Sequence, residues 1–187
     1  MLQANPIARM VNDYLMKMAL PLGLWFIALN LLRYAATSNV ALSMIATPLA
    51  LVTPVALWWI IKQLRNKLGG FILGFQAWIY GVQLMFFAGL IEGLFIYVYN
   101  QFIRPGNLKI IYDASIAQYE NVLTTLKSLG GYESWIPKFE ETLDLMKAEP
   151  VLSAIETAIT TLSNDMFFGM ILMIPISLIV RRMPKAQ

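Results

Sequence analysis

Residues 71–102, FILGFQAWIYGVQLMFFAGLIEGLFIYVYNQF, are the stretch that decides the fold. Only Glu92 carries a charge in this run. A helix needs about twenty apolar residues to cross a bilayer, so the run is long enough to cross once with residues to spare. It therefore predicts a transmembrane helix that tilts or projects beyond the lipid.

Three further apolar runs, at residues 18–32, 40–61 and 166–180, flank this stretch in the sequence. The run 40–61 has no charged residue, and Pro48 and Pro54 should bend it because each removes a backbone donor. The runs 18–32 and 166–180 are short and must include flanking polar residues to cross. The sequence predicts an all-α polytopic membrane protein with four transmembrane helices and an acidic α-helical segment between the third and the fourth.

Composition supports a membrane protein and argues against several other classes. Of 187 residues, 58% are hydrophobic and 13% are charged, which is more apolar surface than a soluble core of this size can bury. The basic residues flank apolar runs, as in membrane anchoring, and form no aromatic-interleaved stripe, so we expect no nucleic-acid binding.

The chain has no Cys and no His. It therefore cannot build a thiolate or imidazole metal site, a disulfide or a Ser-His-Asp triad. We expect no catalytic residues, no metal and no cofactor, and hence no enzyme.

The distribution of Lys and Arg predicts the orientation, because positive loops stay in the cytoplasm. The loop 62–70 and the tail after residue 180 are basic and have no acidic residue. Between Arg104 and Asp165 there are five basic and nine acidic residues, a net charge of −4. We expect a multi-pass protein of the bacterial inner (cytoplasmic) membrane with both termini cytoplasmic. Its parts are 1–103 with three transmembrane helices, the extracytoplasmic segment 104–165, and 166–187 with the fourth helix and the tail.

The outer segment should be helical, because its apolar residues recur at helical spacing. One helix is predicted to end at Gly130 and Gly131, a second to begin near Pro137 and to stop at Glu149 and Pro150. From Pro150 a further apolar stripe continues directly into the fourth transmembrane helix. We expect these three pieces to pack on one another and on the membrane surface.

Glu92 needs a partner, because a lone carboxylate in lipid is costly. Arg33 lies at a similar depth when residues are counted outward, and Arg104 is a second candidate. A structural ion pair or hydrogen bond, a proton or substrate site, and interfacial exposure are the three alternatives.

Asp165 and Asn164 lie where the outer segment enters the membrane, and they mark the outer interface in the simplest interpretation. If the helices bring Glu92 and Asp165 together, the two could form a joint site for a cation or a protonatable substrate. No third carboxylate lies within a helical turn to complete the oxygen shell of a hard cation.

Small residues recur along the third helix at spacings that allow another helix to approach closely. The partner helix is either a neighbour in the same chain or another subunit. These candidate helix-packing residues are Gly70, Gly74, Gly81, Ala88, Gly89 and Gly93.

Residues 69–182 resemble an uncharacterised four-helix bacterial inner-membrane family, a domain of unknown function found mainly in Bacteroidota. The resemblance rests on G-G-F at 69–71, G-F-Q-A at 74–77, F-I-Y-V-Y-N-Q-F at 95–102 and the final Arg181-Arg182. Residues 104–106 depart from the commoner Asp-Pro-like step of the family, so no role for an acid there carries over. The resemblance implies no established activity. Genes of the family are often neighbours of a polyprenyl-phosphate glycosyltransferase of the dolichyl-phosphate-sugar synthase type, which makes such an enzyme a candidate partner.

Three functions are consistent with these features. The leading hypothesis is a non-catalytic inner-membrane subunit or scaffold that binds a membrane partner, or itself, through the third helix and the outer segment. The alternative is a small transporter or flippase-like carrier that uses Glu92. A lipid-linked sugar enzyme using Asp165 is the third.

Overall fold

The computed structural model describes residues 6–36 and 40–182, and within these ranges the protein is all-helical, without a strand. An isolated antiparallel bridge joins Ile72 to Arg182. The helices are α1 (Pro6–Ala36), α2 (Val40–Ala50), α3 (Val52–Lys67), α4 (Gly74–Val98), the π-helix η1 (Tyr99–Ile103), α5 (Asn107–Leu129), α6 (Ile136–Ala148) and α7 (Ala154–Val180).

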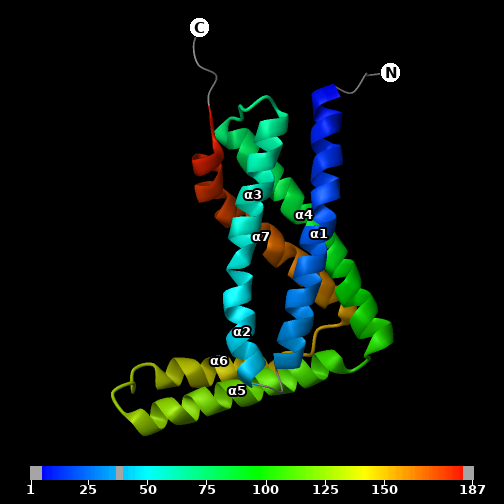
Figure 1. Cartoon of the computed structure of the whole chain (residues 1–187). Coiled ribbons are helices and arrows are strands. Elements are labelled where there is room, and N and C mark those ends of the chain that lie inside the picture. The colour runs from blue at the N-terminus through cyan, green and yellow to red at the C-terminus, as the bar shows by residue number, and fades with distance from the viewer. Residues whose placement is uncertain (1–5, 37–39, 183–187) are drawn as a thin grey trace.

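Three helices of the described chain are long and apolar enough to cross a membrane (Figure 1). They are α1, the continuous helix formed by α4 and η1, and α7, with 31, 30 and 27 residues. At about 1.5 Å per residue each exceeds the roughly 30 Å hydrocarbon layer. The sequence predicted a helix longer than the bilayer only for residues 71–102, but all three helices are longer than the bilayer.

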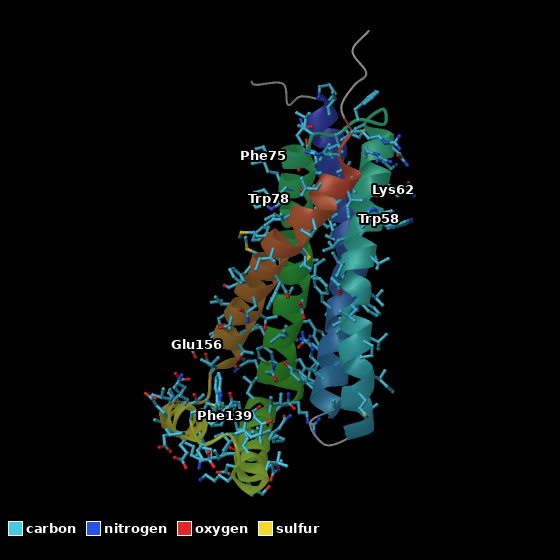
Figure 2. The ribbon with its side chains drawn as sticks, turned by 90° about the vertical axis from the view of Figure 1, so that its left-hand side faces the viewer. Trp58, Lys62, Phe75, Trp78, Phe139 and Glu156 are labelled. Carbon is cyan, nitrogen blue, oxygen red and sulfur yellow. The ribbon has the colours of Figure 1, made fainter. Side chains whose placement is uncertain are left out.

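The predicted helix over residues 40–61 is interrupted between Pro48 and Pro54 rather than only bent. The run is divided into α2 and α3 at Leu51, and neither part alone is long enough to span. Pro54 has no N–H to donate to the Ala50 carbonyl, and its ring crowds that carbonyl. The Leu51 N–H bonds to Pro48 O at 3.1 Å, a tighter turn than in an α-helix. The prolines thus interrupt the helix, although α2 and α3 remain stacked end to end (Figures 1 and 2).

Among the described helices, α4 and α7 make the most extensive contact, and α1 packs on the other side of α4. Glycines on α4 bring α7 close: a Cβ built at Gly81 would overlap the buried Met173 side chain, and one at Gly93 would lie 3.3 Å from the Ala158 carbonyl. Without a hydrophobic force between helices in lipid, such close contact is what holds helices together. On the α1 side, Gly23 fills the same role against Ala88 and Ile91.

The apolar core lies in the half of the bundle that contains the loop between α3 and α4. Its largest fully buried side chains include Leu15, Ile61, Leu64, Leu84 and Met173, one or more from each of α1, α3, α4 and α7. Hydrogen bonds close the same end: Arg65 Nη1 donates to Val180 O at 3.1 Å, and Ile72 and Arg182 exchange backbone bonds. This end therefore holds four helices in fixed register.

The helices α5 and α6 form a hairpin that lies across the opposite end of the bundle (Figure 1). α5 ends at Leu129, and Gly130 and Gly131 have φ of 66° and 78°, in agreement with the predicted helix end. α6 begins and ends within one residue of the predicted positions. The expectation that all three outer pieces pack together is wrong in part, because the first turns of α7 pack against α4 at Gly93 instead.

Substitution of Gly23 with Ala tests the close packing of α1 on α4. The new Cβ would lie 2.9 Å from Ile91 Cβ and 3.0 Å from the Ala88 carbonyl oxygen, so the helices must move apart. We expect Gly23→Ala to lower the free energy of unfolding in mild detergent by about 1–3 kcal/mol.

Gly74→Ala is the matched control, since its Cβ would meet nothing closer than 3.8 Å. Equal stability of the two variants would contradict the close contact at Gly23.

Candidate functional site

The carboxyl group of Glu92 is buried where α1, α4 and α7 meet. The side chain is only 3% exposed. Asn30 of α1 donates its Nδ2–H to Glu92 Oε1. Because Glu92 lies inside the bundle, its carboxyl group must be satisfied by protein groups rather than by water.

Asp165 of α7 lies beside Glu92, and the two carboxyl groups are within hydrogen-bonding reach of each other. A glycine makes room for this approach. A Cβ built at Gly89, nearly one turn before Glu92, would lie 3.2 Å from Asp165 Oδ2 and 3.0 Å from a methyl group of Leu162. The small-residue pattern of α4 therefore positions the second acid of the site.

Arg33 supplies positive charge to both carboxyl groups. It is one turn beyond Asn30 on α1, its side chain is exposed, and its electrostatic attraction reaches both Glu92 and Asp165. Within the described residues it forms no direct ion pair with either acid. The structure thus places Glu92, Arg33 and Asp165 in one cluster, with Arg33 at its edge.

Arg104 and Asn164 do not join this cluster. Arg104 is exposed in the turn after η1, about 18 Å beyond Glu92 along the helix axis at 1.5 Å per residue. Asn164 is exposed although its neighbour Asp165 faces the bundle. Successive residues of a helix point about 100° apart, so adjacency in sequence did not bring Asn164 to the site.

Two of the six predicted packing positions have little contact with another helix. Gly70 precedes α4, in the turn, with φ of 88°, and no atom lies within 4 Å of a Cβ built there. The packing role predicted for Gly70 is therefore wrong, and its positive φ explains the glycine instead. Gly74 touches Arg181 only loosely, whereas Gly81, Ala88, Gly89 and Gly93 are buried against α7 or α1.

Sequence reasoning missed Asn30 and a second group of polar residues toward the hairpin. Asn107 Nδ2 donates to Asn100 Oδ1 at 3.1 Å, and Asn100 Nδ2 donates to Ile96 O at 2.9 Å. Tyr34 of α1 hydrogen-bonds Asn100, is influenced by the charge of Glu92 and stacks on Tyr99. These residues could have been identified from the sequence as uncharged amides inside or beside apolar runs, since amides in lipid also require hydrogen-bond partners.

Asn100 belongs to the π-helix η1, which connects α4 to the hairpin. The Arg104 N–H bonds to Tyr99 O at 2.8 Å, a bond of the wider π type. Both Asn100 and Asn107 are buried. π-Helical turns are frequent at functional sites, and here the turn aims an amide into the bundle. Polar groups therefore extend from Glu92 through Tyr34 and Asn100 to the first residue of α5.

The chemistry available at this cluster is proton binding and hydrogen bonding. Among residues 6–36 and 40–182, no group of three His, Cys, Asp or Glu side chains could hold a metal ion. A shallow apolar groove of about 220 Å³ runs beside the acids between α4 and α7, lined by Gly89, Gly93, Tyr97 and Leu162 among others. The groove faces outward and has little polar lining, so it adds no ligand to the acid pair.

The fold and site define an all-α protein with three helices able to span a membrane and, where these helices meet, a buried Glu92 beside a partly buried Asp165. The chain belongs to the family described as Protein of unknown function (DUF4199), whose model matches residues 17–182. The resemblance to an uncharacterised family is thereby confirmed. Comparisons with curated proteins and with solved structures found no match.

Substitution of Asn30 with Leu tests whether this amide supports the acid pair. Without the Nδ2–H donor, Glu92 Oε1 loses its partner inside the bundle. We expect Asn30→Leu to reduce stability in mild detergent by about 1–2 kcal/mol, because a buried acceptor is left without its donor.

Asn164→Leu is the control at an exposed amide of α7 and should leave the unfolding midpoint unchanged. An Asn30→Leu variant that is as stable as the wild type would show that Asn30 does not support the acid pair.

Proposed function

We propose that the protein is a four-crossing subunit of the bacterial inner membrane, with α2 and α3 together forming the fourth crossing. The two helices stack end to end beside α1 (Figures 1 and 2). They have 11 and 16 residues, so their stack is about 40 Å long at 1.5 Å per residue. Trp25 Nε1 donates to Thr53 Oγ1 at 3.2 Å and holds α3 against α1.

Both termini are proposed to lie in the cytoplasm. Trp58, Lys62, Phe75 and Trp78 lie at similar height toward the end of the bundle that holds the basic loop (Figure 2). Lys62 Nζ lies 4.6 Å from the Trp58 ring centroid. Aromatic rings and lysines are enriched at membrane interfaces, and basic loops favour the cytoplasmic side. The hairpin at the other end, which is rich in acids, then lies outside the cytoplasm.

The hairpin of α5 and α6 is the element that we propose to bind a partner. It holds itself together, with Leu123 and Leu143 buried between the helices and ion pairs from Lys127 to Glu140 at 2.6 Å and from Lys147 to Glu120 at 2.7 Å. The hydrogen bond from Lys147 to Glu120 raises the pKa of the lysine, although this exposed pair adds little stability. Because the hairpin is already folded, it can bind a partner without the entropic cost of folding on binding.

The proposal rests mainly on how far the hairpin of α5 and α6, called the arm here, extends from the bundle. The loop between α5 and α6 extends sideways beyond the bundle (Figure 1). Near this loop Leu129, Tyr132 and Trp135 are 67%, 46% and 56% exposed. Exposed clusters of aromatic and aliphatic side chains mark binding surfaces, and aromatic residues are favoured there.

The partner should stand beside the bundle in the same membrane, because the arm runs across the bundle axis rather than along it (Figure 1). The small residues of α4 do not provide the partner surface, since Gly81, Gly89 and Gly93 are already covered by α7. A second copy of the chain or another membrane protein fits these requirements. The family resemblance makes a polyprenyl-phosphate glycosyltransferase the first partner to test. In this role the chain is a non-catalytic subunit or scaffold.

Cysteine labelling tests the proposed topology. The natural chain has no cysteine, so single-cysteine variants report without background. In spheroplasts a membrane-impermeant maleimide should label Ser128→Cys in the hairpin but not Asn66→Cys at the end of α3, because the bilayer separates them. Both positions are exposed on the protein. Labelling of Asn66→Cys alone would contradict the proposed orientation, and labelling of both would contradict a membrane crossing by α4 between these two positions.

Site-specific crosslinking tests partner binding. A photo-reactive benzophenone amino acid placed at Trp135 should form a protein adduct in native membranes, because this side chain lies at the tip of the arm. The same probe at Glu141, an exposed charged position of α6, is the matched control and should give little adduct.

The Trp135 adduct should disappear when Leu129 and Tyr132 are replaced with Ser, while the bundle keeps its unfolding midpoint. A probe at Trp135 that captures only lipid, or equal protein adducts from both positions, would argue against the proposed surface.

A further inference from the structure

Two buried carboxyl oxygens of the described chain have no hydrogen-bond partner, and they belong to the adjacent acids Glu92 and Asp165. Glu92 Oε1 accepts from Asn30, but Glu92 Oε2 and Asp165 Oδ2 accept nothing. Leaving one buried acceptor unsatisfied costs about 1–3 kcal/mol. The two unsatisfied atoms lie on carboxyl groups that are within hydrogen-bonding reach of each other.

We propose that Glu92 and Asp165 form an intramembrane proton-binding site in which the two carboxyl groups share one proton. Ionised carboxylates only accept hydrogen bonds, so two of them cannot bond to each other. When one group carries a proton, its O–H donates to the oxygen of the other. One proton between Glu92 Oε2 and Asp165 Oδ2 therefore satisfies both unpartnered atoms at once.

The charges around the pair fit this single proton. Among the described residues, α1 contributes Arg33, Asn30 and Tyr34, and α7 contributes Asp165. With one shared proton the acids carry one negative charge, which the one positive charge of Arg33 balances. With two ionised acids the cluster would keep an uncompensated negative charge inside the bundle, which lipid and protein both disfavour.

The donors around the site favour a proton over a metal cation. Asn30 presents its Nδ2–H to Glu92, and the positive end of this dipole opposes a cation bound to the same carboxyl group. Hard cations also require six or more oxygen ligands, and the pair offers at most four carboxyl oxygens, one of them already bonded to Asn30. The site is independent of partner binding by the hairpin, because its residues lie on the bundle helices.

Infrared spectroscopy of the full-length protein in mild detergent at neutral pH detects the proton directly. The wild type should show the carbonyl stretching band of one protonated carboxylic acid per chain. Both Asp165→Asn and Glu92→Gln should lose this band, because the amide replaces the protonated partner and leaves the other acid ionised. Asp113→Asn, at an exposed acid of α5, is the control and should keep it.

Stability provides a second measurement. Asp165→Asn should unfold close to the wild-type midpoint, because its N–H can donate to Glu92 in place of the shared proton. Asp165→Leu should unfold earlier, because Glu92 Oε2 is then left without a donor.

Three results would overturn the proposal. The first is a wild-type spectrum without the band, with stability that rises on adding sodium, which would mean two ionised acids around a cation. The second is a band that persists in Asp165→Asn, which would assign the proton to Glu92 alone. The third is equal loss of stability in Asp165→Asn and Asp165→Leu, which would mean that the acids do not bond to each other.

Discussion

The close contact between α4 and α7 is the constraint on which the rest of the structure depends. In lipid no water is expelled from between apolar helices, so they associate through close packing and polar contacts. Gly81, Gly89 and Gly93 allow the close packing, because they let α7 lie directly on the backbone of α4. The same close approach brings Asp165 to Glu92, which provides the polar contact. Packing and polar contact thus arise from one helix pair.

The bundle is divided into an apolar half and a polar half. The half with the loop between α3 and α4 contains the fully buried core and the backbone bridge between Ile72 and Arg182. The other half contains Asn30, Glu92 and Asp165, followed by Asn100 and Asn107 toward the hairpin. Each polar group there is expensive to bury alone, so the groups occur together and bond to one another. Close packing at the apolar end fixes the positions of the helices. The polar groups at the other end are thereby kept aligned with one another.

The π-helix η1 links the polar half to the hairpin. Asn100 lies within this wider turn and is buried beside Tyr34 and Asn107. Asn107 is also the first residue of α5, so the position of the arm is tied to the polar groups of the bundle.

The sequence by itself determined the elements and their ends. The three spanning helices follow from apolar runs, and the ends of α5 and α6 follow from Gly130, Gly131, Pro137 and Pro150, because these signals act within a few residues. Counting residues also placed Arg33 near the depth of Glu92, since rise per residue is constant. Depth does not determine which helix faces which. Only the tertiary structure paired Glu92 with Asn30 and Asp165, and excluded Arg104 and Asn164. Those outcomes depend on how each helix is rotated and how close its neighbours come, and that is decided by long-range contacts between side chains far apart in the chain.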